Sequence, residues 1–192
     1  MTTNTPYEIL VGVGAMYVAT ALTAMPAVNA TPGGAWRAVG DTEDGVKVAK
    51  TRSLEYHRTD QKTGPVKATL SEEGLEIETK LVSATLENLA DVLNLTVTDV
   101  PPGVGTIGTR KVGLHSMGVV EFALLFRGKS PYGDFPAQFY VPRGVFDDDV
   151  EQEYTKDGKA IIPLKMVALE NANAATEDER FGIYIAQDAA AT

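Results

Sequence analysis

Residues 74–94, GLEIETKLVSATLENLADVLN, change from the periodicity of a strand to that of a helix within a few positions. In the first half, apolar and charged residues alternate, which places Leu75, Ile77, Thr79 and Leu81 on one face of a strand and Glu76, Glu78 and Lys80 on the other. In the second half, apolar residues recur at helical spacing, at Leu86, Leu89, Ala90 and Leu93. Ser83 or Thr85 is the candidate N-cap, and Asn94 lies near the helix end.

The remainder of the chain predicts strands separated by turns. Apolar runs of strand length occupy residues 16–19, 36–40, 46–56, 70–82, 119–126, 137–141, 150–155 and 160–169. Asp41–Gly45 predicts a turn, Pro142 is expected to end a strand, and Asp157-Gly158 predicts a hairpin. The sequence therefore predicts a mainly β fold, an antiparallel β-sandwich or barrel with one flanking α-helix.

Two segments are predicted to be loops. Arg58–Thr69 is polar, lacks periodicity and contains Gly64-Pro65. Thr98–Thr109 is rich in Pro and Gly, and its glycines match the spacing of a dinucleotide-binding motif at Gly103, Gly105 and Gly108. The strand–turn–helix context of that motif is missing, so a plain loop is the better interpretation.

Composition narrows the function classes. The chain has 192 residues, a net charge of −9 and no cysteines. This length suits one domain, and the negative charge disfavours binding to nucleic-acid phosphates. The missing cysteines exclude disulfides, thiol catalysis and cysteine-ligated zinc.

The N-terminal region is uncharged from Ile9 to Trp36. A signal peptide with cleavage near Ala30 is one interpretation, but no Lys or Arg precedes the apolar run and Glu8 stands where positive charge is expected. The run is also too short and too broken for a membrane span. A strand at 16–19 followed by an uncharged loop is the alternative that we favour.

No residue pattern predicts catalysis or a cofactor. The two histidines, His57 and His115, lack a metal-binding or catalytic context. An acidic cluster of alternate carboxylates suits a hard cation but lacks the spacing of a calcium-binding loop; its members are Asp147, Asp148, Asp149, Glu151 and Glu153. We therefore expect no enzyme activity, no cofactor and no metal, and a structural or associative function.

Four sequence blocks, taken in order, resemble the major tail tube proteins of long-tailed, siphovirus-type phages. They are the opening Tyr17–Ala19, Thr23–Pro26, Trp36–Gly40 and Glu43–Val46, the strand-into-helix block 74–94, the core strand Val119–Gly128 and the closing strand Ala160–Leu169. The resemblance implies the tail-tube fold and a structural virion protein located in the tail after assembly in the host cytoplasm. It also implies homo-hexameric rings that stack into a tube, with tail terminator, tape measure and distal tail proteins as partners. DNA passes through the tube during ejection without specific binding, and no membrane is involved.

Within that resemblance, we expect residues 1–30 to form an N-terminal strand and arm, 31–170 the tail-tube β domain and 171–192 a C-terminal arm, with both arms ordered only on assembly. A charged strand face is expected to line an acidic lumen, through Glu76, Glu78 and Lys80. A polar loop is expected to reach the adjacent ring, through Arg58, Asp60, Gln61, Lys62, Gly64, Pro65 and Lys67.

Two alternatives stay open. One is a secreted or surface β-sandwich binding module, whose mature chain begins near Thr31. The other is a related tube from a contractile injection system or a type VI secretion machine.

Overall fold

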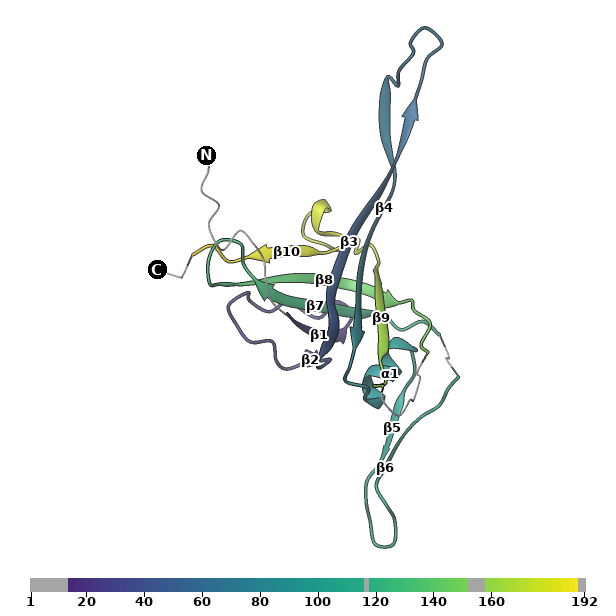
Figure 1. Cartoon of the computed structure of the whole chain (residues 1–192), viewed down its shortest axis with the longest axis vertical. Coiled ribbons are helices and arrows are strands. Elements are labelled where there is room, and N and C mark those ends of the chain that lie inside the picture. The colour runs from purple at the N-terminus through teal and green to yellow at the C-terminus, as the bar shows by residue number, and fades with distance from the viewer. Residues whose placement is uncertain (1–13, 116–117, 152–157, 190–192) are drawn as a thin grey trace.

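The computed structural model describes residues 14–115, 118–151 and 158–189, and Figure 1 shows the arrangement of its elements. The described part is built mainly from antiparallel strands with one α-helix. In chain order the elements are β1 (Ala15–Thr20), β2 (Arg37–Ala38), β3 (Thr42–His57), β4 (Lys67–Leu81), α1 (Leu86–Val92), β5 (Val97–Val100), β6 (Thr109–Val112), β7 (Phe122–Lys129), β8 (Pro136–Phe146), β9 (Ile162–Ala168), a 3₁₀ turn (Glu177–Glu179) and β10 (Ile183–Ala186).

One sheet runs in the order β2-β1-β7-β8-β9-β4-β3, and β10 pairs with β8 beside this path. The main core joins strands from the two ends of this order, since Met16 of β1 and Leu124 of β7 belong to the same buried cluster as Ile77 of β4 and Leu164 of β9. The two halves of the sheet therefore pack against each other around one core. The predicted antiparallel β-sandwich with one flanking helix is confirmed.

The strand-into-helix prediction is confirmed in its boundaries and corrected in its helical face. Thr85 caps α1, because the backbone N–H of Asn88 donates to its hydroxyl at 3.2 Å, and Asn94 beyond the end adopts a left-handed φ of 55°. The buried residues of α1, however, are Asn88, Ala90 and Val92, whereas Leu86 is 37% exposed. Of the predicted stripe, Ala90 is buried and Leu89 packs against the main core, so the prediction is wrong for Leu86. The polar Asn88 is buried beside them, although it was not part of the stripe.

The opposite face of β1, β7 and β8 is covered by the uncharged segment 21–36. Trp36 packs edge-on against Tyr140 and donates its indole N–H to the carbonyl of Ala24. Arg127 donates to the carbonyls of Val28 and Ala30. Polar side chains of the sheet therefore bind the backbone of this loop and hold it in place.

The C-terminal segment is part of the sandwich in the single chain. β10 pairs antiparallel with the first half of β8, from Ile183 opposite Tyr140 to Ala186 opposite Ala137. Phe181 packs against the main core. The expectation that the arm from Asn171 becomes ordered only on assembly is therefore wrong for residues 183–186.

Three local predictions are also corrected. Pro142 lies inside β8 rather than at its end, and the β7–β8 register shifts at this point, since a proline without an N–H fits a bulge. Asp44 and Gly45 take positive φ within a bulge of β3 instead of forming a separate turn. β7 begins at Phe122, and Val119 before it is 74% exposed. The hairpin predicted at Asp157-Gly158 and most of the strand predicted at 150–155 lie outside the described residues.

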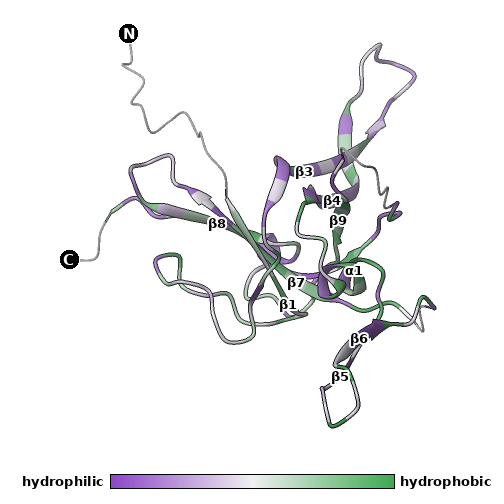
Figure 2. Ribbon diagram, turned by 60° about the horizontal axis from the view of Figure 1, so that its bottom comes forward, coloured by the Kyte–Doolittle hydropathy of each residue, from purple (hydrophilic) through white to green (hydrophobic). Residues whose placement is uncertain are grey.

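Two hairpins project from the sandwich at opposite ends of its longest dimension (Figure 1). The first, here called the arm, comprises residues 51–74 of β3 and β4, beyond the last residue of β4 that pairs with β9. The second, here called the finger, comprises residues 97–112, which form a separate two-stranded sheet of β5 and β6. Figure 2, a view from a second direction, also shows both hairpins extending away from the body.

Candidate assembly surfaces

The charged side chains expected to line a lumen lie together on the outer face of β4. Each of the three is ion-paired to a neighbouring strand: Glu76 to Lys165 of β9 at 3.3 Å, Glu78 to Lys47 of β3 at 2.8 Å, and Lys80 to Asp44 of β3 at 2.8 Å. Their side chains are 32%, 35% and 54% exposed, respectively. The outer face of β3, β4 and β9 is thus a solvent-facing array of charge pairs.

Hydrogen bonding within these pairs favours the charged forms. The bond from Lys47 lowers the pKa of Glu78, and the same bond raises the pKa of Lys47. Lys80 lowers the pKa of Asp44 in the same way, and its own pKa is raised. The pairs Lys47–Glu78 and Lys80–Asp44 therefore remain ionised at neutral pH.

This face is balanced in charge rather than acidic. The three pairs contribute three lysines and three carboxylates, and an adjacent pair, Lys159 with Glu43 at 2.8 Å, is balanced as well. These side chains therefore present balanced charge, although the chain as a whole carries a charge of −9. The lysine partners were not predictable from periodicity, because they depend on the pairing register of the strands. That register places Lys47 of β3 and Lys165 of β9 on either side of Glu78.

The residues expected to reach an adjacent ring lie at the tip of the arm. Arg58, Asp60, Gln61, Lys62, Gly64 and Pro65 form its exposed turn, whereas Lys67 is the first residue of β4 and pairs with His57. The turn is closed by the backbone N–H of Val66, which donates to the carbonyl of His57 at 2.8 Å. The predicted loop is therefore shorter than expected, because residues 67–69 continue the hairpin ladder.

The arm also exposes apolar side chains that the sequence analysis did not assign to a contact. Leu54 lies opposite Leu70, and Tyr56 lies opposite Ala68, so these four side chains share one face of the hairpin. Leu54, Tyr56 and Leu70 are 40%, 58% and 54% exposed. The even spacing of Leu54 and Tyr56 was visible in the sequence, but nothing in it showed that the sandwich ends before they are covered.

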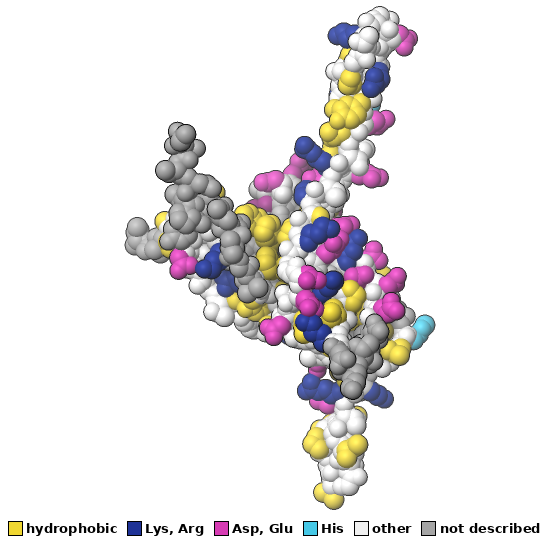
Figure 3. Space-filling view, viewed as in Figure 1, with side chains coloured by type: hydrophobic (Ala, Val, Ile, Leu, Met, Phe, Trp, Pro, Cys, Tyr) yellow, Lys and Arg dark blue, Asp and Glu magenta, His cyan; other side chains and the backbone are white. Residues whose placement is uncertain are grey.

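Figure 3 shows hydrophobic side chains along the arm and again at the far end of the finger. At roughly 3.3 Å per residue, strands of this length carry the tip of the arm roughly 30 Å beyond the paired sheet. An isolated two-stranded hairpin is marginal in water, and exposed apolar side chains favour its association with another surface. The arm thus exposes apolar side chains that the described part of the sandwich does not cover.

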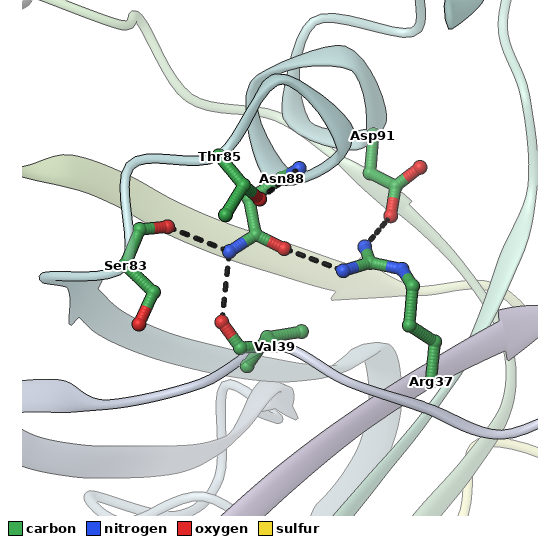
Figure 4. A network of polar contacts seen from close by, with 6 residues as sticks. All are labelled: Arg37, Val39, Ser83, Thr85, Asn88 and Asp91. Atoms are coloured by element: carbon green, nitrogen blue, oxygen red, sulfur yellow. Dashed lines mark hydrogen bonds and ion pairs between the residues drawn. The ribbon is translucent and has the colours of Figure 1, made fainter. Parts of the chain in front are cut away.

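The finger is fastened to the body through α1. Arg110 of β6 forms an ion pair with Glu87 of α1 at 2.5 Å. The helix itself is held by the network in Figure 4, in which Asn88 donates to the carbonyls of Val39 and Ser83 at 2.8 Å each. Arg37 of β2 donates to the Asn88 carbonyl oxygen and forms an ion pair with Asp91. These bonds hold α1 in place, and the Arg110–Glu87 ion pair attaches the finger to this helix.

The described part of the chain was also compared with the sequence predictions for metal-binding and histidine side chains. It contains no group of three or more His, Asp or Glu side chains placed to hold a metal, and Glu153 of the acidic cluster lies outside it. The ring of His57 forms a hydrogen bond with the Thr69 hydroxyl on the exposed arm. None of the described helices has the length and apolarity needed to cross a bilayer.

Comparison with known proteins gives one match and one negative result. Residues 1–190 match the family described as phage tail tube protein. No curated protein matches the chain. The match includes residues 9–30, which a secreted module would lose as a signal peptide, and removal of that segment would take β1 with its core residues Met16 and Val18 out of the sheet. No observation favours the secreted binding module. The chain belongs to the phage tail tube protein family and is a structural protein of the virion tail.

Proposed function

We propose that this chain forms homo-hexameric rings that stack into the tail tube and conduct DNA during ejection. The observation that carries the proposal is the arm, a long hairpin whose apolar side chains are not buried by any described residue of the same subunit. A subunit that completes such a hairpin only in contact with a neighbour is suited to a repeating assembly. The tail terminator, tape measure and distal tail proteins are the further partners, at the ends and in the interior of the tube.

Ring closure would use the edges of the sheet. Within the described residues, the order of the main sheet ends at β2 on one side and at β3 on the other. Edge strands present backbone N–H and C=O groups that pair readily with another chain. Different edges meeting between neighbours make a heterologous contact, which closes into a ring when the rotation permits.

The outer face of β4 would border the lumen through Glu76, Glu78 and Lys80. Since each lysine of the pairs is already bound to a carboxylate, this face presents balanced charge to the DNA. DNA is held on proteins mainly by lysines and arginines that displace its counterions, and ion-paired lysines on a chain of net negative charge are poorly suited to that role. This arrangement supports passage of DNA without retention.

The tip of the arm would contact the adjacent ring. The turn of the arm lies at one extreme of the molecule (Figure 1). Its exposed residues are Arg58, Asp60, Gln61, Lys62, Gly64 and Pro65, and Lys67 begins β4 after the turn. The division into an N-terminal strand and arm (1–30), a tail-tube domain (31–170) and a C-terminal arm (171–192) belongs to the same proposal, as does the absence of catalysis.

Electron microscopy of concentrated purified protein tests the proposal. We expect hollow tubes or six-fold rings in negative stain, and a reconstruction of the tubes with the outer face of β4 toward the axis. A chain that stays monomeric at every concentration up to hundreds of micromolar contradicts self-assembly. Tubes whose lumen is formed by another face contradict the lumen assignment alone.

A further inference from the structure

The finger ends in apolar side chains that are exposed in the described part of the subunit. Val104 is 108% exposed relative to its reference and Ile107 is 80% exposed, and Val100 in the stem is 37% exposed. The apex is a two-residue turn, since Gly103 and Thr106 exchange backbone hydrogen bonds at 3.0 Å each. Gly105 takes a φ of 74°, which a residue with a side chain rarely adopts, so the turn has a defined conformation.

A hairpin turn that faces solvent is not expected to carry apolar residues such as Val104 and Ile107. Turns that face water are dominated by Gly, Pro, Asn, Asp and Ser, whose conformational and hydrogen-bonding properties suit them. Here Val104 occupies the corner beside Gly105, and Ile107 comes two residues after Gly105. Apolar side chains at the end of a projecting hairpin indicate a surface that is buried in a complex.

The finger and the arm have matching chemistry and opposite positions. They project from the two ends of the molecule's longest dimension (Figures 1 and 3), and both carry exposed apolar side chains. Copies stacked along this direction bring the finger of one copy toward the arm of the next. We propose that the end of the finger, Val104 and Ile107, packs on the apolar face of the arm, Leu54, Tyr56 and Leu70, of a second copy of this chain.

This inference rests on the proposed stacking and names a contact within it. The attachment of the finger suits the role, because Arg110 ties its stem to Glu87 of α1 at 2.5 Å and to Asp99 across the hairpin at 4.0 Å. A hairpin with a fixed base loses less conformational freedom when it binds. Since finger and arm are different surfaces, their contact is heterologous and propagates as a filament.

Cysteine cross-linking tests the pairing, because the chain contains no cysteine of its own. One preparation carries Ile107→Cys, and three others carry Leu54→Cys, Tyr56→Cys or Leu70→Cys. Each arm variant is mixed with the finger variant, assembled and treated with a short bis-maleimide linker. We expect covalent dimers in at least one mixture and none when the finger variant is assembled alone. Tyr132→Cys, 66% exposed in the turn between β7 and β8, is the matched control.

Two cross-linking results overturn the inference. One is assembled tubes in which no arm position links to Ile107→Cys. The other is linkage of Tyr132→Cys to the finger as efficiently as linkage of the best arm position, because random collision gives that pattern.

Polar replacement of the finger end gives a second, independent readout. We expect Val104→Ser combined with Ile107→Ser to raise the critical concentration for assembly at least about tenfold, the factor that corresponds to about 1.4 kcal/mol. The melting temperature of the unassembled chain should not change, since both side chains are exposed. A variant that assembles like the wild type overturns the finger contact but not the tube. A wild-type chain that never assembles overturns the proposed function and this contact together.

Discussion

The guanidinium of Arg37, in β2, donates to the side-chain oxygen of Asn88, in α1, at 2.6 Å. This bond joins the short edge strand to a helix 51 residues further along the chain. Asn88 is only 2% exposed, and its side-chain amide donates hydrogen bonds to the carbonyls of Val39 and Ser83. A buried amide is stable only when its donors and acceptor are satisfied, and this one has three partners on two segments, 37–39 and the residue Ser83 before the helix.

Replacement of Asn88 by leucine should destabilise the subunit by about 2–4 kcal/mol. The carbonyl of Val39 would lose its donor in a buried place, and the Arg37 guanidinium would lose an acceptor. Urea denaturation of the unassembled chain measures the change. Leu86→Ala, on the exposed side of the same helix, is the control and should cost about 1 kcal/mol or less. Equal losses in both variants would show that helix propensity, and not the network, sets the stability.

Removal of Arg37 should strengthen the dependence of the subunit's stability on pH through Asp91. Burial raises the pKa of Asp91, and the charge of Arg37 opposes that effect, so Arg37→Ala should raise the pKa further. The folded state then holds this proton more tightly than the unfolded state, and stability falls as pH rises through the interval between the two pKa values. Below the ordinary pKa of an aspartate this penalty vanishes.

Chemical denaturation of Arg37→Ala between acid and neutral pH checks this dependence. In the double variant Arg37→Ala/Asp91→Asn, the added pH dependence should disappear while the loss of the Asn88 bond remains. If the double variant keeps the same dependence, another group is responsible.

The sequence predicts elements whose burial is decided within one strand or helix. Leu75 and Ile77 alternate with charged residues because one side of β4 packs on the core, and that pattern needs no knowledge of other strands. The position of Pro142 inside β8 was not predictable in this way, since the bulge that accommodates it depends on pairing with β7. The burial of Asn88 was not predictable, because two of the partners that make it favourable, Val39 and Arg37, come from a segment about 50 residues away in the chain.

The assembly surfaces show the same limit. Glu76, Glu78 and Lys80 were identifiable as a charged face, but their lysine and aspartate partners follow from a register that periodicity does not fix. The apolar residues Leu54 and Tyr56 were assigned to a strand, and their exposure becomes evident only once the end of β9 is known. A periodic pattern reports which side of an element is buried and not whether the cover comes from the same chain.

Reversal of charge on the outer face of β4 should make assembled tubes retain DNA. Glu76→Lys combined with Glu78→Lys removes the partners of Lys165 and Lys47 and leaves a positive surface. Retention should be measured by filter binding of short duplex DNA, and it should decrease steeply with added salt. The control, Glu177→Lys with Asp188→Lys, makes the same change in net charge on exposed C-terminal positions. Equal retention by the two variants would remove this face from the lumen.

Polar replacement of the arm's apolar face should weaken assembly and leave the subunit fold intact. Leu54→Ser combined with Leu70→Ser changes a cross-strand pair that lies outside both core clusters, so the melting temperature of the unassembled chain should shift little. Full burial of a leucine at a contact is worth about 1.5–3 kcal/mol, and each side chain here is about half exposed beforehand. The critical concentration for tube formation should therefore rise at least about tenfold.

Sedimentation of assembled protein across a concentration series gives that critical concentration, and Glu55→Gln on the opposite face of the same strand is the matched control. Glu55 lies on the arm and is exposed, so its replacement reports any general effect of altering this hairpin. A rise in the serine variant alone assigns the contact to the apolar face. Equal rises in both variants would instead assign the contact to the tip or to the shape of the arm, whereas no rise in either would place the arm outside the assembly contacts.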